Sequence, residues 1–227
     1  MDKFVSVAID GPAGAGKSTM ARALAKDLGY VYVDTGAIYR TVGYYVTLCG
    51  IGPKDIDGVT RLIDDVSIQI AYDADGTQRM ILNGRDVSDE IRTQEMSDCA
   101  SKLSTLKVVR DYLLEVQREL AANHNVVMDG RDIGTVVLPN AAVKIYLTAS
   151  AEVRAQRRLK DYQLKGDKKS TLGAVLQDIR QRDERDMNRP IAPLKQAKDA
   201  VLLDTSELSI EESILAMKKI IEERLNG

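Results

Sequence analysis

A nine-residue stretch near the start of the chain contains the clearest chemistry in the sequence. Residues 11–19 read GPAGAGKST, which matches the pattern G-x-x-x-x-G-K-[ST] in full. A loop of this kind closes its backbone N–H groups around phosphate oxygens, while its lysine adds positive charge toward the β- and γ-phosphates and its hydroxyl reaches Mg²⁺. The predicted ATP site consists of Gly11, Pro12, Ala13, Gly14, Ala15, Gly16, Lys17, Ser18 and Thr19, with Lys17 also acting in catalysis.

A carboxylate for the metal ion is expected at Asp129, directly after the apolar run Val126–Met128. In phosphoryl-transfer sites such a carboxylate holds Mg²⁺ directly or through water. Ser18 and Asp129 are therefore the predicted metal-site residues and Mg²⁺ the predicted cofactor, although a turn or helix-cap role for Asp129 stays open. Asp10, just ahead of the loop, is a weaker metal candidate.

Three arginines in separate parts of the chain are expected to hold the acceptor of the phosphoryl group. Arg40 lies in DTGAIYR, Arg131 lies in DGRDIG, and Arg189 ends the charged run RQRDERDMNR. Ligands of open α/β sheets collect beyond the carboxyl ends of the strands, and convergent guanidinium groups suit a dianionic phosphate monoester. A phosphate monoester is therefore a better predicted acceptor than water or a protein.

The charged run also has a helical pattern. Arg182, Asp186 and Arg189 are spaced i, i+4 and i+7, which places them along one stripe of a helix. Asp183 and Glu184 are expected to face water, and Pro190 is expected to end the helix. The spacing alone does not say what the stripe faces.

A second arginine cluster, Arg154, Arg157 and Arg158, begins a helix that Ser150 is expected to cap. Exposed charge runs are common, so a solvated helix face is one interpretation. Phosphoryl transfer favours another, because positive charge that arrives with the second substrate stabilises the transferred group and excludes water. Arg154 and Arg158 are therefore predicted catalytic residues on a mobile lid.

A GTP-dependent switch is a poor fit. Its base-reading segment needs Asn-Lys-x-Asp, and no Asn-Lys pair occurs in the chain; residues 73–76 match D-x-x-G but are better explained as a hairpin turn. The pattern favours a kinase that transfers a phosphoryl group to a phosphate monoester, and two alternatives to this interpretation remain open. One is a non-enzymatic nucleotide-binding module, and the other is a kinase with a different small acceptor such as UMP.

The elements that position these residues alternate between strands and helices. Short apolar runs separated by helical patterns indicate an α/β fold with a parallel sheet covered on both faces. Strands are predicted at 4–9, 30–33, 126–128, 143–147 and 200–203, and helices at 17–28, 37–48 and 210–225.

The stretch 66–92 breaks this alternation, because VSIQIAY, the turn DADGT and QRMILNG form an antiparallel hairpin pattern. Together with its flanking helices it suggests a separate lobe over residues 36–109. Such lobes often grip a second substrate, although a decorative insertion is the alternative.

Composition sets limits on the remaining possibilities. The 227-residue chain has 32 basic and 34 acidic residues, so it lacks the uniform positive field of a protein that binds a nucleic-acid polymer. Cys49 and Cys99 have no metal or disulfide spacing, and the single His124 is expected on a surface loop. Without an apolar run of membrane length, we expect a cytoplasmic protein that does not enter a membrane.

Five segments together resemble the bacterial cytidylate kinases, which are part of the nucleoside monophosphate kinase group of P-loop proteins. They are GPAGAGKST, DTGAIYR, EIRTQE, DGRDIGTVV followed by Leu-Pro, and RDERDMNRPIAPL, in this order. The resemblance covers nearly the whole chain and includes the hairpin. Thr35 stands where many members have serine, and the loop ends Lys-Ser-Thr where others have Lys-Gly-Thr.

The resemblance implies a P-loop core over residues 1–35 and 110–227, a helical lid at about 152–190, and a monophosphate-binding lobe over 36–109. It implies ATP and CMP or dCMP as substrates and a monomer as the active form, with CMP preferred over UMP. The pyrimidine would be contacted by Ser101, Arg110 and Asp132, the sugar by Arg182 and Asp186, and the acceptor phosphate by Arg40, Arg131 and Arg189, with Thr35 beside them.

Overall fold

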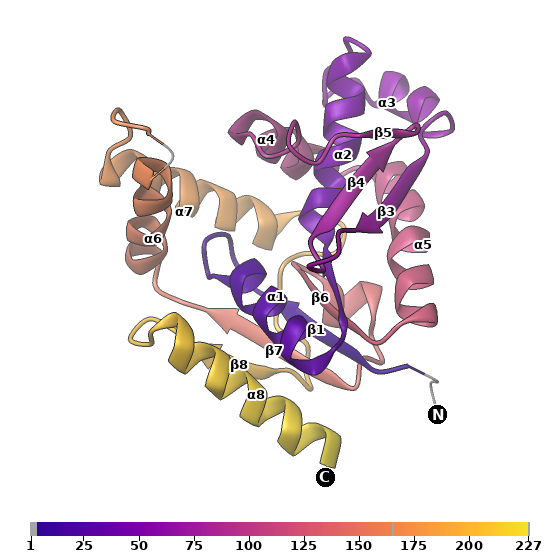
Figure 1. Cartoon of the computed structure of the whole chain (residues 1–227). Coiled ribbons are helices and arrows are strands. Elements are labelled where there is room, and N and C mark those ends of the chain that lie inside the picture. Colours follow the sequence, from indigo (N-terminus) through magenta and orange to yellow (C-terminus); the bar gives the residue numbers. More distant parts are fainter. Residues whose placement is uncertain (1–3, 165, 227) are drawn as a thin grey trace.

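A five-stranded parallel sheet forms the centre of the computed structural model, which describes residues 4–164 and 166–226. Residues 1–3 and 227, at the ends of the predicted core, and Lys165, inside the predicted lid, lie outside the described residues. The strand order is β2-β6-β1-β7-β8 (Figure 1). The strands are β1 (Ser6–Asp10), β2 (Val31–Asp34), β6 (Val126–Gly130), β7 (Val143–Thr148) and β8 (Val201–Asp204), each within two residues of its predicted bounds.

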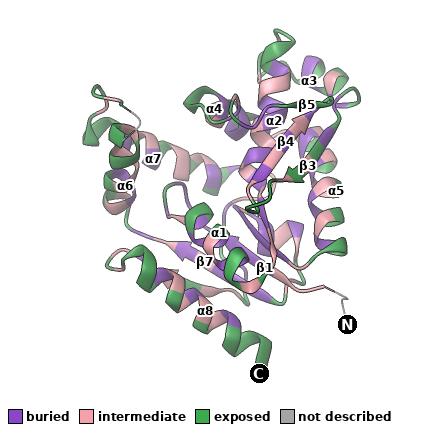
Figure 2. Ribbon diagram, viewed as in Figure 1, coloured by how far each residue is buried: buried purple, intermediate pink, exposed green. Residues whose placement is uncertain are grey.

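Consecutive residues of these strands enter two different apolar clusters. In β6, Val127 packs with α1 (Lys17–Leu28) and α8 (Ile210–Asn226), whereas Val126 and Met128 pack with α2 (Thr35–Leu48) and α5 (Lys107–Asn123). Side chains alternate between the faces of a strand, so a sheet covered on both sides needs continuous apolar strands. The central strands β1, β6 and β7 are largely buried between the two layers (Figure 2), whereas the edge strand β8 is only partly covered. The predicted α/β class is confirmed.

The predicted hairpin is present as part of a second, antiparallel sheet. Strands β3 (Ile68–Tyr72) and β4 (Gln78–Leu82) are joined by a turn in which Gly76 N donates to Asp73 O at 2.9 Å. A third strand, β5 (Arg85–Asp86), was not predicted. Both residues in the connecting turn have positive φ, 47° at Asn83 and 81° at Gly84, and this two-residue turn returns the chain onto β4. The strand β5 consists of two exposed polar residues, so it lacks the alternation of apolar and polar residues by which a strand is predicted from sequence.

The small sheet packs with helices α3 (Ile56–Ile63) and α4 (Gln94–Leu103) in the same apolar cluster that covers one face of the large sheet. Leu82, Leu103 and Met128 are all buried in this cluster. The segment inserted between β2 and β6 is therefore continuous with the core that supports it.

Two further helices, α6 (Ala151–Leu164) and α7 (Leu172–Asn188), pack against each other around a small cluster of their own, made by Ala155, Val175 and Ile179. In Figure 1 this pair lies to the left, and α3 with the small sheet lies to the right. Ser150 Oγ accepts the N–H of Val153 at 3.2 Å, which confirms the predicted cap of α6. We call α6 and α7 the helical hairpin.

The remaining predictions about the surface are also tested by the structure. His124 is exposed at the end of α5, as predicted, and the two cysteines are free, Cys49 exposed and Cys99 buried. Among the described helices, none has the length and apolar character needed to cross a bilayer.

Candidate functional site

The loop between β1 and α1 is shaped by its glycines. A Cβ on Gly11 would lie 1.9 Å from the carbonyl oxygen of Leu147, so only glycine lets the loop approach β7 this closely. Gly16 caps α1 in the left-handed region, with φ of 87°, and no side chain caps this helix. The N–H groups of the first turn therefore have no helical partner and point at a position where a phosphate would satisfy them.

Lys17 crosses this loop. Its Nζ donates to Pro12 O at 2.8 Å, and the residue is 6% exposed. Burial, followed by the positive charge of Arg131, lowers the pKa of Lys17 to about 7. A phosphate next to Nζ would favour the charged amine, because an anion stabilises the protonated form.

The two predicted metal-site residues meet although 111 positions separate them. Ser18 Oγ donates to Asp129 Oδ2 at 3.0 Å, and Tyr32 Oη donates to Asp129 Oδ1 at 2.8 Å. Burial, with a contribution from the charge of Asp34, raises the pKa of Asp129 to about 6. A hydroxyl and a carboxylate are hard oxygen ligands of the type that Mg²⁺ prefers.

No cluster of three or more His, Cys, Asp or Glu side chains suited to a metal occurs among the residues that the structure describes. A magnesium ion at Ser18 and Asp129 would therefore take its other ligands from water and phosphate, which is usual for this ion. Asp10 has a different role. Its two carboxylate oxygens accept the N–H groups of Ile133 and Gly134 at 2.7 and 2.8 Å, and so fix the short π-helix η1 (Ile133–Val137) against β1.

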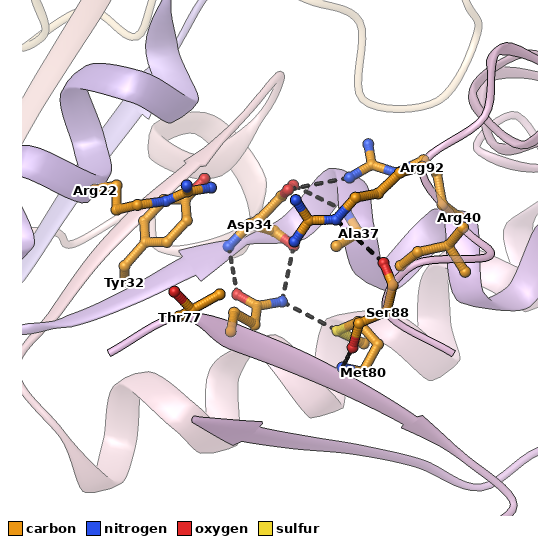
Figure 3. A pocket seen from close by; sticks show the side chains of 11 residues that line it. Arg22, Tyr32, Asp34, Ala37, Arg40, Thr77, Met80, Ser88 and Arg92 are labelled. Atoms are coloured by element: carbon orange, nitrogen blue, oxygen red, sulfur yellow. Dashed lines mark hydrogen bonds and ion pairs between the residues drawn. The ribbon is translucent and has the colours of Figure 1, made fainter. Parts of the chain in front are cut away.

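Arg40 is directed to a carboxylate that the sequence did not single out. Its Nη2 lies 3.0 Å from Asp34 Oδ2, at the edge of a pocket of about 100 Å³ between β2, α2 and β4. Figure 3 shows Arg22, Arg40 and Arg92 around this pocket, with the Asp34 carboxylate hydrogen-bonded to Arg40 and to the backbone of Ala37. Asp34 follows an apolar strand just as Asp129 does, and that signal could have identified it.

Arg131 pairs with Asp186, and this pair is the centre of a second group of charged residues, distinct from Lys17, Ser18 and Asp129. Arg131 Nε lies 2.8 Å from Asp186 Oδ2. Burial raises the pKa of Asp186, but Arg131, Arg189 and Arg182 together hold it below its usual value. Burial and the charges of Arg131 and Arg158 lower the pKa of Arg182 to about 10. The predicted stripe of α7 therefore faces inward, toward Arg131.

A buried triad next to this pair joins three of the predicted pyrimidine and phosphate residues. Asp132 accepts Arg110 Nη2 at one oxygen and Arg189 Nη2 at the other, the latter at 3.0 Å. Arg189 also donates to Ser104 Oγ at 3.2 Å. Arg131, Arg182 and Arg189 thus gather around two carboxylates, whereas Arg40 pairs separately with Asp34.

Thr35 and Ser101 have different surroundings. Thr35 Oγ1 donates to the backbone oxygen of Asp129 at 2.7 Å, so it joins α2 to β6. Ser101 is buried on α4 and accepts a hydrogen bond from Arg185 at 3.1 Å.

Arg154 joins the helical hairpin to the loop between β1 and α1, which we call the phosphate loop. It is 5% exposed, its Nη1 donates to Ala13 O at 3.0 Å, and its Nη2 lies 2.7 Å from Asp183 Oδ2. The prediction that Asp183 faces water is therefore wrong, because Asp183 neutralises a buried guanidinium; Glu184 is exposed as predicted.

Arg158 reaches across to α4. Its Nη2 donates to Gln94 Oε1 at 2.7 Å and its Nε to Tyr162 Oη at 2.7 Å. Arg157 instead donates to Thr205 O at 2.6 Å and ties α6 to the loop after β8. Nothing in the sequence pattern distinguished the partners of these neighbouring arginines.

Comparison with known proteins places the chain in one family. Residues 7–223 match the family model described as cytidylate kinase. A cytidylate kinase of Carboxydothermus hydrogenoformans is 49% identical over 215 residues, which is 95% of this chain and 96% of that protein. One from Caldicellulosiruptor bescii is 46% identical over 220 residues, with 97% and 95% covered.

A solved structure agrees with this chain at the level of the fold. An uncharacterised protein from Eubacterium ventriosum aligns with a TM-score of 0.53 at 11% identity, covering 96% of this chain and 98% of that one.

Proposed function

This chain belongs to the cytidylate kinase family, and from that membership we propose that it transfers the γ-phosphoryl group of ATP to CMP or dCMP, giving ADP and CDP or dCDP. One observation about the site carries the proposal. Arg131 pairs with Asp186 at 2.8 Å and also lies close enough to Lys17 to lower the pKa of that lysine. The phosphate loop and a second anion-binding cluster therefore adjoin, as transfer between two phosphates requires.

On the donor side, the loop would cradle the triphosphate, with Lys17 moving from Pro12 O to the phosphate oxygens. Ser18 and Asp129 would hold Mg²⁺. When bound, this ion neutralises charge on the β- and γ-phosphates. The pKa of about 6 leaves Asp129 mostly ionised at neutral pH, so its carboxylate is available as a ligand.

On the acceptor side, Arg110 and Asp132 would read the base. Cytosine offers an N4 amino donor beside the acceptors N3 and O2, which suits a carboxylate and a guanidinium held in one pair. Uracil has the acceptor O4 where cytosine has the amino group. Because the Asp132 carboxylate also only accepts hydrogen bonds, O4 and the carboxylate would repel each other. We therefore propose that CMP is preferred over UMP.

The remaining charged residues would hold the sugar and the phosphate. Asp186, fixed by Arg131 and near Arg182, would bind ribose hydroxyls. Arg40, Arg131 and Arg189 would take the phosphate, and Arg40 and Arg189 would exchange Asp34 and Asp132 for it. An ion pair is a suitable resting state for such a guanidinium, because a dianionic phosphate replaces the carboxylate without leaving the charge unpaired.

No general base is required, because a phosphate monoester is already largely ionised near neutral pH. Catalysis then consists of positioning and charge neutralisation, with Lys17, Arg131, Arg154 and Arg158 around the transferred group. Closure of the helical hairpin would exclude water from ATP. We further propose that a single 25.0 kDa chain is the active form, which light scattering would test.

Steady-state turnover with ATP and each of CMP, dCMP, UMP and AMP tests the function. We expect CMP and dCMP to exceed UMP by at least about tenfold in kcat/KM. Equal values for CMP and UMP would contradict the roles of Arg110 and Asp132. Nucleotide binding without turnover of any monophosphate would instead support a non-enzymatic module.

A further inference from the structure

Arg185 is a charged residue of α7 to which none of the roles above applies. Its Nη1 donates to Ser101 Oγ at 3.1 Å, across 84 positions of the chain. Ser101 lies on α4, in the inserted segment, whereas Arg185 lies on the helical hairpin directly before Asp186. The bond therefore connects the serine expected at the pyrimidine with the helix expected at the sugar.

The hydroxyl of Ser101 lies in the middle of a helix but does not bond to the backbone of that helix. A serine or threonine inside a helix can donate to the carbonyl four residues earlier. In the part of the chain that the structure describes, five side chains do so at 2.7–3.0 Å: Thr41, Thr47, Thr60, Ser97 and Ser213. Over the described residues Ser101 Oγ donates no hydrogen bond, and its one partner is Arg185.

The chemistry of a guanidinium decides how this contact is used. Arginine only donates, so Ser101 Oγ must accept with one lone pair. Its hydrogen and its second lone pair remain free for a ligand. Ser101 is only 9% exposed, so few water molecules compete for them.

We infer that Arg185 is a positioning residue for pyrimidine recognition, which keeps the Ser101 hydroxyl away from the carbonyl of Ser97 and available to the base. This inference rests on the proposed function. Without Arg185, the Ser101 hydroxyl would turn to its own helix, as Ser97 does one turn earlier.

The test compares Arg185→Ala, Arg185→Lys, Ser101→Ala and the double variant in steady-state assays with CMP, UMP and ATP. We expect Arg185→Ala to raise the KM for CMP about five- to tenfold, the size of one hydrogen bond between neutral groups, while kcat and the KM for ATP stay unchanged. Ser101→Ala should have the same effect, and the double variant should be no worse than Ser101→Ala. The CMP-to-UMP ratio of kcat/KM should fall in both single variants.

Two further variants separate positioning from a structural role. Arg185→Lys keeps a donor that cannot accept, so it should recover most of the CMP affinity. Arg180→Ala is the control, because Arg180 is an exposed arginine on the same helix whose side chain, over the described part of the chain, pairs with Glu152 alone. Arg180→Ala should leave the KM values for CMP and ATP and the CMP-to-UMP ratio of kcat/KM unchanged.

The failures are distinguishable. A wild-type protein without CMP-dependent turnover would refute the proposed function. If the wild-type protein turns over CMP normally and Ser101→Ala has an unchanged KM for CMP, the proposed function stands and the inference about Arg185 is overturned. Additive losses in the double variant, or equal losses in KM for CMP and ATP, would also overturn it.

Discussion

Lys17 is the residue at which burial and charge conflict most directly. It is 6% exposed and lacks an ion pair within 4 Å among the described residues, and burial lowers its pKa from 10.5 to about 7. The unfolded chain therefore binds more protons than the folded one between pH 7 and about 10.5. Stability rises with pH across that window, and the full cost of the buried charge is present below pH 7.

Replacement of Lys17 by methionine should relieve this cost. We expect the free energy of unfolding at pH 6.5 to rise by about 1–3 kcal/mol, with the gain shrinking toward pH 10, while turnover is lost. Urea unfolding of both proteins from pH 6 to pH 10 measures it. A gain that does not vary with pH would show that packing, rather than charge, is responsible.

Asp186 tests the acceptor site at the same scale. Asp186→Ala removes the partner of Arg131 and a candidate ribose ligand, so the KM for CMP should rise about 10- to 100-fold with little change in the KM for ATP. Initial rates at varied CMP and ATP measure it. Glu184→Ala, an exposed carboxylate on the same helix, is the matched control; an unchanged CMP dependence in Asp186→Ala would remove residue 186 from the site.

At the scale of elements, α4 and α6 are held together by a small polar contact. Gln94 Oε1 accepts both Arg158 Nη2 at 2.7 Å and Tyr162 Oη at 3.0 Å. The helical hairpin has only a small apolar cluster of its own, so such contacts contribute substantially to holding it against the inserted segment.

Gln94→Ala should therefore loosen the hairpin without unfolding the core. We expect backbone amides of residues 151–164 to exchange about 3- to 10-fold faster with solvent, corresponding to about 1 kcal/mol of lost hydrogen bonding, while β1 and β6 keep their protection. Hydrogen exchange followed by mass spectrometry measures it. Gln196→Ala, an exposed glutamine elsewhere, controls for loss of the side chain; equal exchange in the two variants would show that Gln94 does not hold the hairpin.

Across the whole molecule, the proposed donor and acceptor sites lie at the carboxyl ends of β1, β2 and β6 but use different side chains. In the proposed function, Ser18 and Asp129, which are hydrogen-bonded to each other, belong to the donor half, and Asp132 and Asp186, which pair with Arg189 and Arg131, belong to the acceptor half. Removal of a divalent metal should therefore weaken one half selectively.

Thermal unfolding with each ligand tests this separation. At about 100 times its dissociation constant, a ligand adds about 2.7 kcal/mol, or roughly 5–10 °C in Tm for a chain of this length. EDTA should reduce the shift produced by a non-hydrolysable ATP analogue and leave the shift with CMP intact. In the Ser18→Ala variant, the shift in Tm produced by the ATP analogue should no longer depend on EDTA. Equal loss of both shifts on EDTA addition would contradict the assignment of the metal to Ser18 and Asp129.

Features that depend on neighbours along the chain could be predicted from the amino-acid sequence. The phosphate loop is a continuous segment, the parallel strands are continuous apolar runs, and the stripe of Arg182, Asp186 and Arg189 follows from helical spacing. These patterns are local, and therefore β1, α1 and α8 lie within two residues of their predicted bounds.

The pairing of charges, in contrast, depends on how the elements pack in three dimensions. Arg110 with Asp132, Arg131 with Asp186, and Arg154 with Asp183 are contacts set by sheet order and helix packing. Asp183 shows why spacing was insufficient: the carboxylate looked solvated on its own helix, but α6 brings a buried guanidinium to it. A single period along one helix has no information about the charge on the helix packed against it, and that charge determines whether a polar side chain faces water or completes a site.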